Sequence, residues 1–94
     1  KKMTFHESDD DLSPETRDLH RALESLKEEL EAIDWYNQRI DGAKDKELKA
    51  LLSHNRDEEK EHAAMLIEWV RRRDHAFSKE LKDWLFSDKP FVHN

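Results

Sequence analysis

A glutamate and a histidine in the second half of the chain have a spacing that suits a metal ion. Glu59 and His62 are three residues apart, so on one helix their side chains project from the same face, about 5–6 Å apart. A carboxylate oxygen and an imidazole nitrogen placed in this way can bind one metal ion. Asn55, Glu59 and His62 also occupy positions between Leu52 and Leu66 where the pattern predicts apolar residues. Burying an unpaired carboxylate costs several kcal/mol, so Glu59 requires a partner.

A third candidate ligand, Glu29, lies in the first half of the chain. At 100° per residue it projects roughly 60° from Leu26, at the edge of an apolar stripe. If the turn is centred near Ala43, Glu29 lies 14 residues before it and Glu59 lies 16 residues after it. At 1.5 Å per residue the two glutamates then lie within about 3 Å of the same level. Di-iron carboxylate proteins use two Glu and two Glu-x-x-His motifs. One chain holds half of this set, which predicts a centre completed by two copies.

Other interpretations of the same residues remain open. A chain this rich in Glu and His is expected to contain one Glu-x-x-His by chance, so the motif alone is weak support. A buried Glu–His ion pair, or a polar layer that fixes helix register, would need no metal. The chain would then be a helical hairpin with a structural or interaction role. Non-catalytic binding of Zn(II) or another divalent ion is a third interpretation. A di-iron peroxidase or oxygenase is less favoured, because so small a chain offers no recognisable substrate pocket.

Two long helices are predicted to position these ligands. Ser13-Pro14-Glu15 is typical of a helix start, and the helix has no breaker before Asp41-Gly42. Its apolar residues alternate at spacings of four and three, with Asn37 in the skipped position: Leu19, Leu23, Leu26, Leu30, Ile33 and Ile40. Asp45 is placed to cap a second helix. That helix repeats the pattern at Leu48, Leu52, Asn55, Glu59, His62, Leu66 and Trp69. A short Gly-containing turn between the helices predicts an antiparallel hairpin with coiled-coil-like packing.

The ends of the chain are predicted to differ from the hairpin. Residues 1–12 are polar and acidic and are expected to be flexible. Residues 13–90 are expected to form the helical domain, and residues 91–94 a tail. A short third helix before Pro90 is indicated by the spacing of Phe77, Leu81, Trp84 and Leu85. The pattern leaves open whether this helix continues the second or turns away near Asp74.

Composition narrows the class of protein. Of the 94 residues, 43% are charged, 35% are hydrophobic and only one is Gly, which favours an all-α fold built from long amphipathic helices. So small and polar a chain buries little core alone, so association is expected. The net charge of −6 argues against a nucleic-acid partner. The chain has no Cys and no apolar stretch near the roughly 20 residues of a membrane helix, so we expect neither thiolate chemistry nor a membrane partner, and a cytoplasmic location.

Two stretches of the sequence closely resemble the helix motifs of the encapsulated ferritins. The first is Glu28-Glu29-Leu30-Glu31-Ala32-Ile33-Asp34-Trp35-Tyr36. The second is His54-Asn55-Arg56-Asp57-Glu58-Glu59-Lys60-Glu61-His62-Ala63-Ala64-Met65. Their order, the length between them and the following Glu68-Trp69 with its arginine cluster also fit, so the resemblance covers roughly residues 13–90.

This resemblance implies a function and an assembly. Family members are ferroxidases that oxidise Fe(II) with dioxygen at a di-iron centre shared between two subunits. Their homodimers form a ring, described as a decamer, inside the shell of an encapsulin nanocompartment in the cytoplasm, where iron is stored. Paired hairpins would give a ferritin-like four-helix bundle. Members usually carry a C-terminal targeting tail, which is not seen in the residues up to Asn94, so encapsulation is inferred from the resemblance alone.

The resemblance also assigns site residues. The di-iron ligands of the family fall on Glu29, Glu59 and His62, the three residues selected above. A secondary metal site, through which cations approach, falls on Glu28, Glu31 and Trp35. From the residues alone, a charge-laced surface is the preferred interpretation of that second group.

Two further features have lower priority. His54, Glu58 and Glu61 form a stripe on the second helix that is interpreted first as a salt-bridged surface and second as an adventitious metal site. Ca²⁺ or Zn²⁺ is expected at any such secondary site. Tyr36 lies on the same side of its helix as Glu29, two turns further on. It is interpreted as a packing residue, with support of the metal ligands as the alternative.

Overall fold

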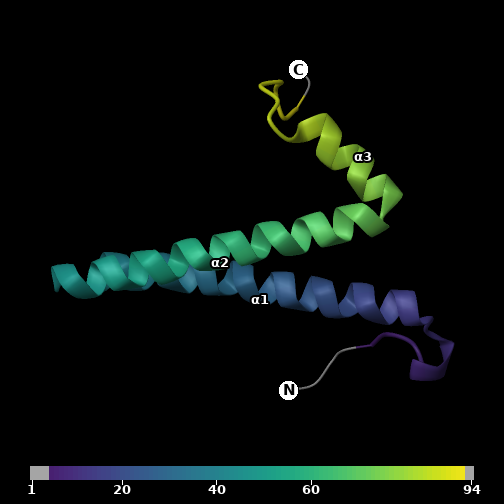
Figure 1. Ribbon diagram of the computed structural model, residues 1–94, viewed down its shortest axis with the longest axis horizontal. Coiled ribbons are helices and arrows are strands. Elements are labelled where there is room, and N and C mark those ends of the chain that lie inside the picture. The colour runs from purple at the N-terminus through teal and green to yellow at the C-terminus, as the bar shows by residue number, and fades with distance from the viewer. Residues whose placement is uncertain (1–4, 93–94) are drawn as a thin grey trace.

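The computed structural model describes residues 5–92, so the predicted segments 1–12 and 91–94 lie in part, at 1–4 and 93–94, outside the described residues. A 3-10 turn, η1 (Asp9–Asp11), precedes three α-helices: α1 (Pro14–Gly42), α2 (Lys46–Arg73) and α3 (His75–Trp84). Figure 1 shows α1 and α2 side by side as a hairpin, with α3 leaving the end of α2 at an angle. Residues 5–92 contain no strand. The predicted all-α hairpin with a short third helix is confirmed.

Each α-helix begins at a side chain that accepts a hydrogen bond from the backbone. The hydroxyl oxygen of Ser13 accepts one from the N–H of Thr16 at 3.1 Å. Asp45 and Asp74 cap α2 and α3 in the same way, at 2.8 and 2.9 Å. Such a cap stabilises a helix by about 1 kcal/mol. Because Asp74 both ends α2 and caps α3, the third helix turns away and does not continue the second. Gly42, predicted in the turn, instead ends α1, and residues 43–45 make the connection.

The stripe that the two long helices bury against each other is shifted from the predicted one. Among residues 5–92, the buried hydrophobic side chains are Ala22, Ala63 and Val70. Leu23 and Leu30, predicted to lie in the seam, are 47% and 52% exposed. Each helix therefore presents its small residues to its neighbour and turns part of its leucine stripe outward. The physical reason is that the apolar face of each helix is wider than one neighbouring helix covers.

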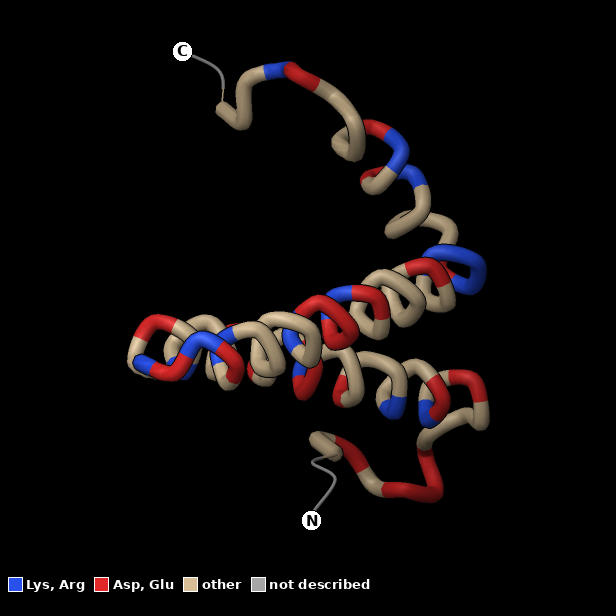
Figure 2. The backbone as a smooth tube through the Cα atoms, turned by 60° about the vertical axis from the view of Figure 1, so that its left-hand side comes forward, with Lys and Arg blue, Asp and Glu red and all other residues tan. Residues whose placement is uncertain are grey.

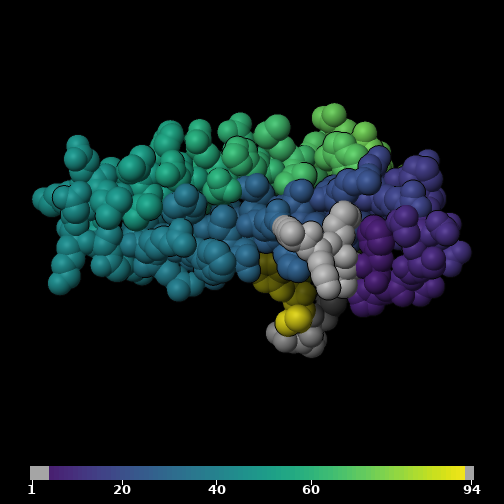
Figure 3. Space-filling view, turned by 90° about the horizontal axis from the view of Figure 1, so that it is seen from below, coloured from purple at the N-terminus to yellow at the C-terminus, as the bar shows by residue number. Residues whose placement is uncertain are grey.

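A single chain does not enclose a core. Its radius of gyration is 17.2 Å, whereas a compact chain of this length has a value of about 12 Å. Figure 3 shows the two helices in contact along their length, with the N-terminal segment at one end. Large apolar side chains remain exposed along the hairpin, at Leu23, Leu30, Leu48, Leu51 and Met65. This amount of uncovered apolar surface is typical of a chain that associates.

Polar contacts fix the register of the hairpin and the angle of α3. Within the hairpin, the guanidinium of Arg56 donates a hydrogen bond to the side-chain oxygen of Asn37 at 3.1 Å. At the end of α2, Arg71 donates two hydrogen bonds to the carboxylate of Glu68, at 2.6 and 2.8 Å, and a third to the hydroxyl of Ser78 on α3, at 3.1 Å. Arg71 therefore links α2 to α3.

Candidate metal centre

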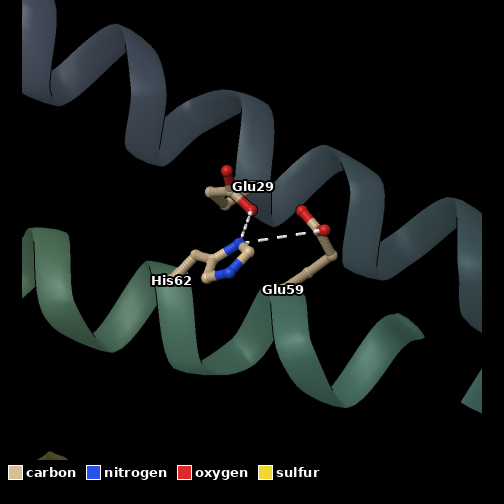
Figure 4. Close-up of side chains that lie close together, drawn as sticks. All are labelled: Glu29, Glu59 and His62. Atoms are coloured by element: carbon tan, nitrogen blue, oxygen red, sulfur yellow. Dashed lines mark ion pairs between the residues drawn. The ribbon is translucent and has the colours of Figure 1, made fainter. Parts of the chain in front are cut away.

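Three side chains from two helices converge midway along the hairpin. Glu29 projects from α1, and Glu59 and His62 project from successive turns of α2 (Figure 4). The Nδ1 atom of His62 lies 3.4 Å from Oε1 of Glu29 and 3.9 Å from Oε1 of Glu59. One ligand atom from each residue lies within 4.8 Å of the other two. The antiparallel hairpin therefore brings the predicted ligands to one level, as the residue count from the turn requires.

The two carboxyl groups perturb each other. A hydrogen bond with Glu29, then partial burial and the charge of Glu29, raise the pKa of Glu59 above its ordinary value, while His62 acts in the opposite direction. Oε1 of Glu29 is buried and accepts no hydrogen bond. A buried carboxylate oxygen without a hydrogen bond, next to a second carboxyl and an imidazole, fits a cation better than it fits an empty polar layer. The donor set of two oxygens and one nitrogen suits iron and zinc alike.

The three ligands are open on one side. The side chains of Glu29 and Glu59 are 23% and 25% exposed, whereas that of His62 is 50% exposed. His62 lies at the wall of a groove of about 620 Å³, whose other lining residues include Ala22, Ser25, Met65 and Trp69. This groove was not predicted from the sequence. The feature of the sequence that could have indicated the groove is the pair of small residues on α1, Ala22 and Ser25, which leave space opposite the large side chains of α2.

The remaining predicted site residues do not form a comparable cluster. Among residues 5–92, the only group of three or more potential ligands is the one already described. Glu28 and Glu31 are exposed, and Trp35 beside them is 48% exposed. His54 and Glu58 form an ion pair at 3.7 Å, but Glu61 does not complete a three-ligand group with them. Secondary metal sites at both positions therefore stay predictions.

Tyr36 is partly buried, and its ring lies near the guanidinium of Arg39. The guanidinium of Arg39, one turn from Trp35, lies 5.7 Å from the centre of the Tyr36 ring and 5.9 Å from that of Trp35. Cation–π contacts at this distance are weakly stabilising. A supporting role of Tyr36 toward the metal ligands stays a prediction.

Comparison with known proteins assigns the chain to a family. The family described as EncFtn-like matches residues 4–88 of the chain. The chain belongs to the EncFtn-like family. Two curated relatives of this EncFtn-like chain are the encapsulated ferritin-like protein of Rhodospirillum rubrum, 54% identical over 93% of the chain, and the ferritin-like protein of Thermotoga maritima, 51% identical over 94% of it. The chain spans 62% of the length of the first relative and 77% of the second.

A solved structure and a third relative are also similar to this chain. The crystal structure of protein ne0167 from Nitrosomonas europaea is 67% identical and has a TM-score of 0.90, covering 95% of this EncFtn-like chain and 98% of that one. The encapsulin nanocompartment cargo protein EncC of Myxococcus xanthus is 42% identical over 53% of the chain. No helix among the described residues is long and apolar enough to cross a membrane.

Proposed function

We propose that this EncFtn-like protein is a ferroxidase that oxidises Fe(II) with dioxygen at a di-iron centre shared between two copies of the chain. The observation that carries the proposal is the convergence of Glu29, Glu59 and His62 within 4.8 Å, on two helices and open on one side. Three ligands do not complete the coordination of one iron ion, and they are too few for two. A second copy related by a two-fold axis would supply the other three.

The exposed apolar face supports the sharing of the site between two copies. Leu23, Leu30 and Met65 are 47%, 52% and 63% exposed. Met65 follows His62 by one turn of α2 and lines the same groove. A second hairpin packed over this groove would bury these side chains and close the open side of the ligand cluster. At about 25 cal/mol per Å² of apolar surface, this burial would favour the four-helix bundle.

The chemistry follows from the ligands. Carboxylate oxygens are hard donors that stabilise Fe(III) more than Fe(II), so they favour oxidation. Glu29, which comes from the other helix and contacts His62, would bridge the two iron ions, while Glu59 and His62 of each chain would hold one ion. Two-metal sites hold their ions roughly 3.5–4 Å apart. Two Fe(II) ions at this spacing can each give one electron to the same dioxygen molecule, which takes up two protons and leaves as hydrogen peroxide, with two Fe(III) ions as the other product.

The other functions weighed from the sequence make different predictions. In a metal-free hairpin, the contacts of His62 with Glu29 and Glu59 would serve the fold alone, and loss of either would change stability but not iron oxidation. A zinc binder would retain its metal but would not accelerate iron oxidation. Activity with Fe(II) and dioxygen distinguishes both from a ferroxidase.

We further propose that the protein works inside an encapsulin shell. The support is that one relative is an encapsulated ferritin-like protein and another is an encapsulin nanocompartment cargo protein. The groove of about 620 Å³ beside the cluster is too small to hold an iron mineral, so the oxidised iron would be stored in the space around the protein.

Aerobic Fe(II) oxidation, followed by ultraviolet absorbance, tests the ferroxidase. We expect Fe(II) to be oxidised faster with the wild type than without protein. The excess of this rate over the uncatalysed rate should fall at least tenfold in each of three variants: Glu29→Ala, Glu59→Ala and His62→Ala. Glu47→Ala and His6→Ala are matched controls, since both residues are exposed and lie outside the cluster. If the wild type does not accelerate Fe(II) oxidation, or if the three variants are as fast as the wild type, the cluster serves only to fix the register of the two helices.

A further inference from the structure

A second hollow lies at the junction of α2 and α3. Figure 2 shows Lys and Arg gathered at this end of α2, while on α3 Lys residues alternate with Asp and Glu. The hollow measures about 520 Å³, and its lining consists of Arg71, Arg72, Arg73, His75, Ser78 and Lys82. No carboxylate lines it, although the chain as a whole carries a net charge of −6. A concentration of cations against the sign of the whole molecule favours an anionic ligand.

Two of the arginines are held in place before any ligand binds. Nε of Arg72 donates a hydrogen bond to Glu68 at 2.7 Å, which leaves its two terminal nitrogens without a described partner. The guanidinium of Arg73 stacks 3.8 Å above the ring of Trp69 and donates one hydrogen bond to the carbonyl of that residue, at 3.3 Å. Arginines held in this way lose less conformational entropy on binding than free ones.

Of the three residues that α3 contributes to the lining, Ser78 accepts a hydrogen bond from Arg71 and the other two have no described partner. Lys82 and His75 take part in no described hydrogen bond or ion pair within residues 5–92, unlike Lys79, which pairs with Asp83 at 3.2 Å. We do not attribute anion binding to the N-terminal N–H groups of α3, since the side chain of Asp74 already accepts a hydrogen bond from the N–H of Phe77. The site therefore consists of side chains from two helices that face one hollow.

We propose that this hollow binds inorganic phosphate. A guanidinium fork matches two oxygens of a tetrahedral oxyanion, and an ammonium adds a point charge without a geometric demand. The site is separate from the iron ligands: Arg71–Arg73 follow His62 by 9 to 11 residues, which is roughly 15 Å along the helix. Because its cations come from both α2 and α3, bound phosphate also fixes the angle between these helices.

Calorimetric titration of the metal-free protein with inorganic phosphate, at constant ionic strength in chloride, tests the proposal. We expect saturable binding of one phosphate per chain. Lys82→Gln should raise the dissociation constant at least tenfold, because Lys82 has no other described partner to lose. Lys44→Gln is the matched control: it removes the same charge from an exposed position in the connection at the opposite end of the hairpin. Hydrogen exchange in α3 should slow in phosphate in the wild type and not in Lys82→Gln.

Two results would overturn the proposal. One is the absence of saturable phosphate binding to the wild type. The other is an equal rise of the dissociation constant in Lys44→Gln, which would show that the effect depends on the net charge of the protein and not on this hollow.

Discussion

Nδ1 of His62 on α2 lies 3.4 Å from Oε1 of Glu29 on α1. This contact joins residues 33 positions apart in the sequence, at the level where Glu59 also meets Glu29. Two carboxyl groups and one imidazole at one level are electrostatically incomplete, because the carboxyl groups repel each other when both are ionised. A cation relieves that repulsion, so the site should be less stable empty than filled.

The raised pKa of Glu59 predicts how the stability of the metal-free protein depends on pH. A carboxyl group with a raised pKa keeps its proton in the folded state at pH values where the unfolded chain has lost it. The contribution of Glu59 to the free energy of unfolding is therefore fully present below the ordinary value of 4.5 and is lost as pH rises through the raised pKa. Glu59→Gln should remove this fall. Urea unfolding in chelator at about pH 4 and about pH 7 measures it. Glu47→Gln, in the first turn of α2, should keep the wild-type dependence.

Metal binding should offset the repulsion between the carboxyl groups of Glu29 and Glu59 and so stabilise the folded protein. A ligand that binds only the folded state raises the free energy of unfolding by about 2.7 kcal/mol when its free concentration is about 100 times its dissociation constant. Anaerobic Fe(II) should therefore raise the thermal midpoint of the wild type, while His62→Ala should respond weakly or not at all. An equal rise in both proteins would place the stabilising metal elsewhere.

A charge on the outward apolar face should separate association from folding. Leu23 is 47% exposed on a single chain and lies six residues before Glu29. Leu23→Lys should leave the helical circular dichroism of the hairpin intact, abolish the dimer in sedimentation and remove at least tenfold of the oxidation rate advantage. Ala76→Lys adds the same charge at an exposed position of α3 and serves as control. If Leu23→Lys is monomeric and fully active, one chain is sufficient for activity.

The Glu68–Arg71–Arg72 cluster should make the α2–α3 junction sensitive to acid. Hydrogen bonds from Arg71 and then Arg72 lower the pKa of Glu68 from 4.5 to about 2. The cluster therefore stabilises the fold above about pH 4.5, and this contribution is lost as pH falls toward about 2. The protection factors of the α3 amide hydrogens, which correct for slower intrinsic exchange in acid, should fall over this range in the wild type. They should be low throughout in Glu68→Gln, whereas Glu80→Gln, which leaves the cluster intact, should follow the wild type.

Val70 is the most deeply buried large side chain, with 1% of its surface exposed. Val70→Ala removes two methyl groups and leaves a cavity, so the free energy of unfolding should fall by about 2 kcal/mol. Val92, 72% exposed, offers the same substitution without burial and should change stability by less than about 0.5 kcal/mol. Equal effects of the two substitutions would show that the end of α2 is not part of the core.

The sequence was sufficient to predict the elements and the convergence of the ligands. Ser13 and Asp45 identify the helix starts through local chemistry, and counting residues from the turn places Glu29 level with Glu59. Both inferences need only the geometry of an α-helix. The side of each helix that faces its neighbour could not be predicted. Leu23 and Ala22 are both apolar, so the sequence pattern does not decide which of them lies between the two helices. The link between Arg71 and Ser78 was also not predicted, since it depends on the angle at Asp74.

The most direct test of the shared centre is iron K-edge X-ray absorption on protein loaded anaerobically with one Fe(II) per chain. The proposed centre predicts an iron–iron scattering distance of roughly 3.5–4 Å, with oxygen and nitrogen neighbours. It also predicts that this distance is absent in the monomeric Leu23→Lys variant. Isolated iron ions in the wild type, with no second iron within that range, would contradict the central claim that two chains build one di-iron site.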